Sequence, residues 1–173
     1  AIDQIWIISI DKKRYIDIIR PMKNELLIHN LFKKNIDAFM KNDPHLSGLG
    51  NQKYIFHPSL EREMLLDVPG IYILTGGRQV GKSTLMKLLI KNMLVEKRTS
   101  PQQVSYVACD LFERYQELVT VMQEMFEEID RERYFWLFLD EITYVKEWDR
   151  AVKHFADLGY FKNGSLLITG SDS

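Results

Sequence analysis

A glycine-rich stretch, GGRQVGKS at positions 76–83, has residue types and a spacing that suit phosphate binding. It fits the pattern G-x-x-x-x-G-K-[ST], whose glycines let the backbone curl so that successive N–H groups point at one anion. An apolar, β-prone segment, 71–75, precedes it, and apolar residues at helical spacing follow it. Strand, glycine loop and helix together predict a polyphosphate site, because a helix N-terminus adds free N–H groups and a favourable dipole.

The residue types in this loop predict separate roles. Lys82 is expected to reach the β- and γ-phosphates as a point charge, and the Ser83 hydroxyl to ligate Mg²⁺. The predicted nucleotide-binding residues are those of the loop and the helix start, namely Gly76, Gly77, Arg78, Gln79, Val80, Gly81, Lys82, Ser83 and Thr84. The alternative is a glycine turn before an ordinary helix, with Lys82 merely exposed.

A second motif, YFWLFLDE at positions 134–141, follows further along the chain. Its run of apolar residues suits a strand that is buried on both faces of a parallel sheet. Two carboxylates stand at its carboxyl end, where ligands bind in open α/β sheets. Asp140 is expected to hold Mg²⁺ through its water shell, and Glu141 to orient or deprotonate an attacking water. The simpler alternative is a strand end followed by an acidic turn.

Composition restricts the classes of function. With 173 residues, 46% hydrophobic residues and 27% charged residues, the chain is typical of a globular domain. A net charge of −1 gives no bulk attraction for nucleic acid, and no basic-aromatic patch supports such binding. The lone cysteine, Cys109, is expected to be buried at a strand end and is compatible with a reducing cytoplasm, the predicted location. The histidines lack zinc spacing, and no apolar run reaches the roughly 20 residues that cross a bilayer.

From residue 71 onward, helical and strand patterns alternate. The predicted strands cover 71–75, 104–108, 134–139 and 165–169, and the helices follow the glycine loop and cover 115–129 and 148–158. This alternation predicts an α/β fold with a doubly wound, mostly parallel sheet.

The first 66 residues are predicted to be a mostly helical region that precedes the core or packs on it, and residues 67–173 to be the core. Apolar residues keep a rough helical spacing from Met22 to Met40, and breaks are expected at 42–44 and 47–50. Ser59 is a candidate cap for a short helix. The core is expected to continue past Ser173, because the last predicted strand should feed another helix.

The lysines of the N-terminal region, Lys33, Lys34 and Lys41 among them, alternate with acids and amides. This pattern favours a solvated helix face over a binding patch.

Three segments together, GGRQVGKST, FLDEITYVKEW and LLITGSDS, resemble the predicted AAA-type P-loop ATPases of bacteria and archaea. The resemblance covers about residues 65–173, and its specificity rests mainly on Trp148 and on Thr169-Gly170-Ser171. It implies a three-layer P-loop NTPase with a mostly parallel sheet of the additional-strand (AAA/RecA-like) type. In that fold, one inserted strand separates the acidic strand from the loop strand.

The resemblance also implies ATP as the nucleotide, with Mg²⁺ and with hydrolysis. It implies a polar sensor residue after the fourth strand, for which Ser171 is the first choice and Thr169 the second. Either residue could instead cap a strand end. The predicted catalytic residues are therefore Glu141, Lys82 and Ser171.

The implied partners are ATP, a further C-terminal domain of the same protein, and a neighbouring copy that supplies an arginine in trans. Within the sequence, Arg78 and Arg150 are the nearest basic candidates, but no motif places either of them. Since positive charge on the transferring phosphoryl group supplies much of the rate, weak turnover is expected from this chain alone.

Three classes of function stay open. The first is an Mg²⁺-dependent ATPase module that drives or gates an attached effector domain. The second is a nucleotide-dependent interaction switch with little turnover. The third and least favoured is a small-molecule P-loop kinase, because no arginine-rich lid is evident.

Overall fold

Four parallel strands form the centre of the structure, a computed structural model that describes residues 29–49 and 66–171. They are β1 (Gly70–Gly76), β2 (Val104–Ala108), β3 (Phe135–Asp140) and β4 (Gly164–Ser171). Their order across the sheet is β1-β4-β3-β2, and all three neighbouring pairs are parallel. The inserted β4 separates the loop strand from the acidic strand, which confirms the predicted additional-strand α/β fold.

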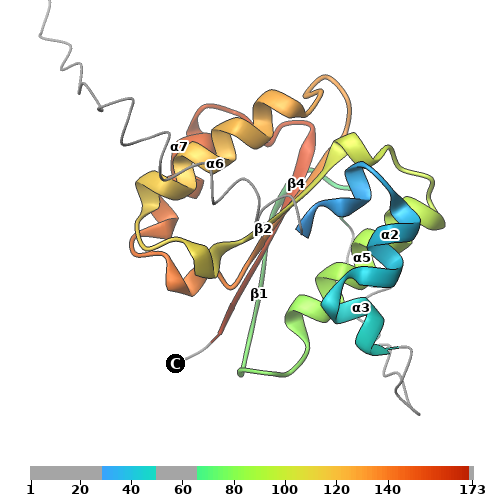
Figure 1. Ribbon diagram of the computed structural model, residues 1–173. Helices are drawn as coiled ribbons and strands as arrows, with labels where there is room; N and C mark the ends of the chain where they lie inside the picture. The colour runs from blue at the N-terminus through green and yellow to red at the C-terminus, as the bar shows by residue number, and fades with distance from the viewer. Residues whose placement is uncertain (1–28, 50–65, 172–173) are drawn as a thin grey trace, which may run out of the picture.

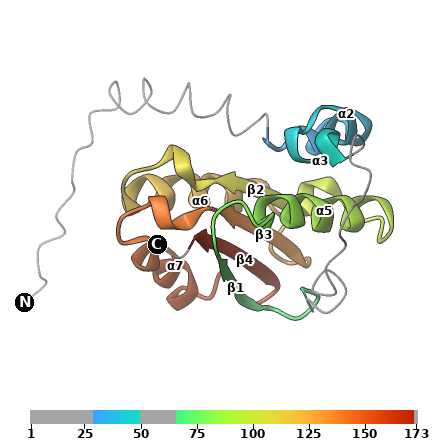
Figure 2. The ribbon, with the colours of Figure 1, turned by 90° about the horizontal axis from the view of Figure 1, so that it is seen from below.

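Helices cover both faces of the sheet in three layers. Helix α5 (Lys82–Val95) lies on one face, and α6 (Tyr115–Glu128) and α7 (Trp148–Asp157) lie on the other (Figure 1). Short 3-10 helices connect these elements at Leu31–Lys33, Pro101–Gln103, Cys109–Leu111 and Ile142–Tyr144. The described part of the N-terminal region adds α2 (Ile36–Asn42) and α3 (Pro44–Leu49), which lie on the outer side of α5 (Figure 2).

Two apolar clusters fill the space between these layers. Strand side chains alternate between the faces, so Leu137 and Leu139 enter the cluster beneath α6 and α7, whereas Trp136 and Phe138 enter the cluster beneath α5. The β2 and β3 strands are buried along their whole length, as the continuous apolar runs predict. The β1 strand alternates between half-buried and exposed side chains because it forms one edge of the sheet.

The helical run predicted from Met22 to Met40 is interrupted in the described part of the chain. Asn35 has extended backbone angles and its side chain accepts a hydrogen bond from the Ala38 N–H, so a new helix begins after it. The predicted break at 42–44 is present at Asp43, but the one at 47–50 is wrong for residues 47–49, which belong to α3. Asp43 accepts hydrogen bonds from the N–H groups of His45 and Leu46 and so stabilises the start of α3.

The other edge of the sheet is closed by a side chain instead of a strand. The Asn30 amide donates to the Tyr106 carbonyl at 2.7 Å and accepts from the Tyr106 N–H at 2.8 Å. These two bonds satisfy backbone groups of β2 that would otherwise face outward from the sheet. A similar anchor holds the entry to β1, where the Leu66 carbonyl accepts from Trp136 Nε1 and the Ser165 hydroxyl.

The ends of β2 and β4 lie close to the predicted positions. Cys109 is fully buried directly after β2, as expected. Ser171 lies inside β4 instead of after it, because Gly76 pairs with Ser171 and extends the ladder two residues past the predicted end at Thr169. The helix proposed after Ser59 lies outside the described residues, and the division of the chain at 66/67 stays a prediction. Within residues 29–49 and 66–171, no helix combines the length and apolar character needed to cross a membrane.

Candidate active site

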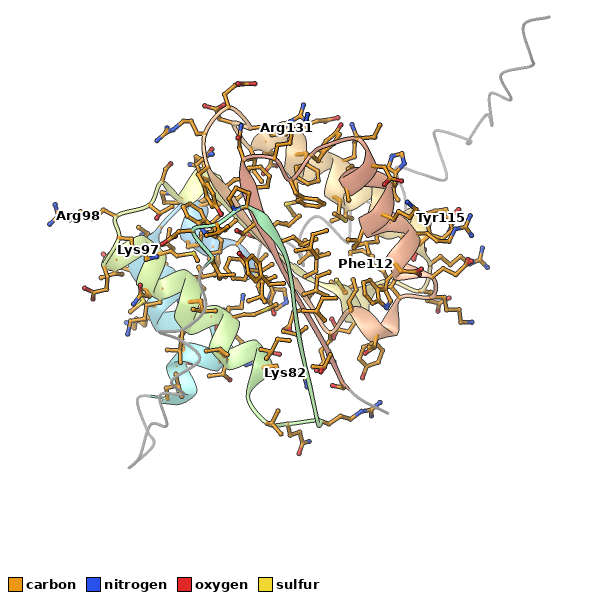
Figure 3. All side chains as sticks on the ribbon, turned by 180° about the vertical axis from the view of Figure 1, so that it is seen from behind. Lys82, Lys97, Arg98, Phe112, Tyr115 and Arg131 are labelled. Atoms are coloured by element: carbon orange, nitrogen blue, oxygen red, sulfur yellow. The ribbon has the colours of Figure 1, made fainter. Side chains whose placement is uncertain are left out.

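The glycine loop connects the end of β1 to the first turn of α5, at the carboxyl edge of the sheet (Figure 3). Gly81 immediately precedes α5 with φ of +95°, a left-handed conformation that any side chain would strain. Its carbonyl accepts the first helical hydrogen bond, from the Leu85 N–H. Arg78, Gln79 and Val80 are exposed, whereas Ser83 and Thr84 are half-buried in the first turn of the helix.

Lys82 is buried and folds back over the loop. Its ammonium donates to the carbonyls of Gly76 at 2.9 Å and Gly77 at 2.7 Å, and to the Ser171 hydroxyl at 3.2 Å. Because Gly76 pairs with Ser171 in the sheet, the loop strand and β4 end side by side. The ammonium therefore lies where β1, β4 and the helix start meet.

Asp140 ends β3 and is almost fully buried. Both of its oxygens accept hydrogen bonds from hydroxyl groups: Tyr106 donates to Oδ2 at 2.5 Å, and Thr169 donates to Oδ1. Since two neighbouring strands contribute these donors, the carboxylate is held in one orientation.

Glu141 follows in the left-handed conformation, with φ of +53°, which is uncommon for a residue with a side chain. The Thr169 hydroxyl accepts from the Glu141 N–H at 2.9 Å, and the Ser171 hydroxyl lies 2.9 and 3.1 Å from the two oxygens of the Glu141 carboxylate. Ser171 therefore contacts both Lys82 and Glu141.

Gly170 in β4 leaves room for the chain that turns at Glu141. A Cβ at Gly170 would lie 2.8 Å from the Thr143 side chain, in the 3-10 helix that follows Glu141. Glycine at this position lets that 3-10 helix pack directly on β4, which places the carboxylate of Glu141 beside Ser171.

Of the sequence-predicted residues, the structure brings together Lys82, Asp140, Glu141, Thr169 and Ser171. Ser83 and Thr84 follow Lys82 in the same turn. Arg150 lies elsewhere, at the start of α7, where it pairs with Glu147 and stacks on the Tyr115 ring.

A sequence profile described as an AAA domain matches residues 69–173. The chain belongs to the AAA domain family. The match confirms the resemblance drawn from the three motifs, and it establishes the chain as a P-loop ATPase module at the level of the family. A solved structure described as Rhizobiales Trip13 is similar at a TM-score of 0.40 with 15% identity, over 90% of this chain and 58% of that one. The chain thus spans little more than half of that protein's length. No curated protein matches the sequence.

Sequence reasoning missed a set of residues beneath the site of this AAA domain. Lys87 is fully buried in α5 and its ammonium lies 3.3 Å from Asp43 Oδ2, 3.2 Å from the His29 carbonyl and 3.3 Å from the centroid of the Tyr106 ring. A signal was present: Lys87 shares a helical row with Ile90 and Leu94, so a cation stands on an apolar stripe.

Burial shifts the ionisation of several of these groups. Desolvation lowers the pKa of Lys87 to about 8, although the nearby Asp43 carboxylate acts in the opposite direction. The pKa of His29 is also lowered, by burial first and by the Lys87 charge second. Burial and then the Asp140 charge raise the pKa values of Tyr106 and Cys109, so both groups stay protonated.

Proposed function

We propose that this AAA domain binds ATP with Mg²⁺ at the carboxyl edge of the sheet and hydrolyses it to drive or gate an effector domain. The observation that carries the proposal is the Ser171 hydroxyl, which contacts Lys82 at 3.2 Å and Glu141 at 2.9 Å. A single hydroxyl thus links the cation expected to bind phosphate and the acid expected to act on water. Hydrolysis needs a cation that binds the transferred phosphoryl group and, beside it, an acid that orients the attacking water.

Lys82 and the loop supply the binding part of this function. The carbonyls of Gly76 and Gly77 hold the ammonium over the loop instead of in solvent. A buried ammonium beside backbone N–H groups and a helix N-terminus forms a strongly favourable environment for a polyphosphate. Ser83 and Thr84 continue this surface along the first turn of α5.

The oxygen donors at this edge fit Mg²⁺. Ser83 offers a hydroxyl and Asp140 a carboxylate, both of the hard-oxygen type that this ion prefers. In the part of the chain that the structure describes, no group of three or more His, Cys, Asp or Glu side chains could form a complete protein cage. That agrees with an ion that keeps several waters and is bound mainly by phosphates. When bound, Mg²⁺ would neutralise phosphate charge.

Glu141 is the residue to which we assign the orientation or deprotonation of the attacking water. Its carboxylate receives the Ser171 hydroxyl, and its backbone is fixed by Thr169. We assign Ser171 as the sensor, because its hydroxyl reaches Lys82. Thr169, which is fully buried against Asp140, has the role of holding the two acids.

The test combines calorimetric titration of ATP and GTP, each with Mg²⁺, and phosphate release under single-turnover conditions. Wild type should bind ATP and release phosphate slowly, because the arginine expected in trans is missing from a lone copy. The Glu141→Gln variant should bind ATP equally well and lose phosphate release at least a hundredfold, as general-base catalysis supplies about that factor. Equal phosphate release by both proteins would contradict the assignment of Glu141.

ATP binding by wild type without any phosphate release would favour the second candidate, a nucleotide-dependent switch. The Ser171 contact supports that candidate too, because it would couple the phosphate-binding lysine to the backbone turn at Glu141.

A further inference from the structure

Tyr106 is the buried side chain that connects the site to the rest of the molecule. It lies in β2 and only 1% of its surface is exposed. Its hydroxyl donates to Asp140 Oδ2 at 2.5 Å, so it fixes the orientation of the carboxylate that we assign to Mg²⁺. A phenylalanine would fill the same space in the core but could not make this hydrogen bond.

The N-terminal segment 29–49 holds Tyr106 by two routes. Asn30 binds both backbone groups of Tyr106, at 2.7 and 2.8 Å. Asp43 forms an ion pair with Lys87 at 3.3 Å, and the Lys87 ammonium lies over the Tyr106 ring at 3.3 Å from its centroid. A desolvated ammonium over an aromatic face attracts the ring and resists its displacement.

Both routes start from a segment that is far from Tyr106 in the sequence. Asn30 and Asp43 precede Tyr106 by more than 60 residues, yet both act on it through buried polar contacts. Buried charges cost free energy unless they are paired, and Lys87 and Asp43 meet this requirement by pairing with each other directly above the Tyr106 ring.

We propose that Tyr106 is a positioning residue for Asp140, and that the segment 29–49 sets its position through Asn30 and the Asp43–Lys87 pair. The segment thereby controls how strongly Mg²⁺ strengthens nucleotide binding. The inference rests on the proposed function, since it takes Asp140 as the carboxylate that holds the ion through water. Groups that orient such carboxylates commonly change metal affinity by 10- to 100-fold.

The first test is the variant Tyr106→Phe, which keeps the ring beneath Lys87 and removes only the hydroxyl. ADP affinity is measured by calorimetry with excess Mg²⁺ and again with a chelator, and the ratio of the two affinities gives the Mg²⁺ coupling. The coupling should fall about tenfold, whereas the affinity without Mg²⁺ should stay within about twofold. The bound Mn²⁺ signal, measured by electron paramagnetic resonance with ADP, should weaken in parallel.

The matched control is Tyr134→Phe, which removes another tyrosine hydroxyl from the opposite end of β3, where it bonds to the Leu66 carbonyl. This control should keep the wild-type coupling. Wild-type coupling in Tyr106→Phe would overturn the inference and leave the proposed function standing. No nucleotide binding by wild type would remove the proposed function, and the inference with it.

The second test addresses the N-terminal segment. The double variant Asp43→Asn/Lys87→Met removes both charges together. Added to the wild-type protein, the two substitutions should lower the Mg²⁺ coupling about threefold. Added to the Tyr106→Phe variant, they should cause no further loss. An equal loss in both backgrounds would show that the pair does not act through Tyr106. If the double variant is unstable, Asn30→Ser provides the same comparison, because it removes the amide that binds the Tyr106 backbone. An unchanged coupling in Asn30→Ser would likewise overturn the role of the segment.

Discussion

The face of the sheet beneath α6 and α7 is closed by apolar side chains, whereas the face beneath α5 contains buried charges. On the first face, the centroid of the Phe126 ring lies 4.7–5.8 Å from the ring centroids of four other aromatic residues, Phe135, Phe155, Tyr160 and Phe161. On the second face, Asp43, Lys82, Lys87 and Asp140 are all buried. Apolar packing therefore stabilises both faces, and the face beneath α5 additionally holds buried polar groups in fixed positions.

The largest expected effect is on the apolar face. Phe126→Ala should lower the free energy of unfolding by about 3–5 kcal/mol, because it leaves a cavity among four rings. Denaturant unfolding would measure the loss. ATP affinity per folded molecule should not change, since the aromatic cluster does not touch the nucleotide loop. A loss of ATP affinity in the folded fraction would show that the aromatic cluster also determines the geometry of the nucleotide site.

On the charged face, Lys87→Met should lower the free energy of unfolding by about 3 kcal/mol, because it leaves the Asp43 carboxylate buried without its cation. The expected cost is at the low end for such pairs, since Asp43 still accepts from two backbone N–H groups. The double variant Asp43→Asn/Lys87→Met should recover most of this loss. If the double variant were as unstable as Lys87→Met, the loss of stability would come from lost packing of the Lys87 side chain and not from an unpaired charge at Asp43.

A smaller effect should appear with pH. The pKa of Lys87 is about 8 in the folded protein, below the ordinary 10.5, so between these values the unfolded chain binds more protons. Stability from this group should therefore rise with pH from 8 to 10, by at most about 2 kcal/mol. The titratable groups around it are the carboxylates of Asp43 and Asp140, the Tyr106 hydroxyl and the His29 imidazole, whose lowered pKa leaves it neutral in this range.

The measurement is the difference in unfolding free energy between wild type and Lys87→Met across this pH range. The buried Cys109 and Tyr106, whose raised pKa values act in the opposite direction, are present in both proteins and cancel. A difference that does not change with pH would mean that the Asp43 carboxylate offsets the burial and that the pKa of Lys87 is not lowered.

The sequence predicted the apolar side of the fold well, because periodic runs such as the one from Tyr115 to Ile129 carry their own helical signal. The glycine loop and the Asp140-Glu141 pair are local patterns, so the sequence also predicted that both lie at the carboxyl edge of the sheet, whereas their roles in binding and hydrolysis stay predictions. The sequence could not predict that Ser171 contacts Lys82, because that contact depends on β4 being inserted beside β1.

The contacts that join Asp43, Lys87 and Tyr106 have no signal in the sequence for a different reason. The sequence pattern places Tyr106 in an apolar strand and Asp43 at a break between helices, and nothing in either pattern connects the two. Their partners come from segments far apart in the sequence, and without the packing of α3 on α5 no local pattern joins them.

Calorimetric titration with MgATP tests whether the edge of the sheet around Lys82 is a nucleotide site. Wild type should be compared with Lys82→Ala and with Lys91→Ala, which removes a lysine from the same helix nine residues further on. We expect Lys82→Ala to lose ATP binding and Lys91→Ala to retain it. Binding of MgATP by Lys82→Ala with wild-type affinity would show that the edge of the sheet around Lys82 is not the nucleotide site.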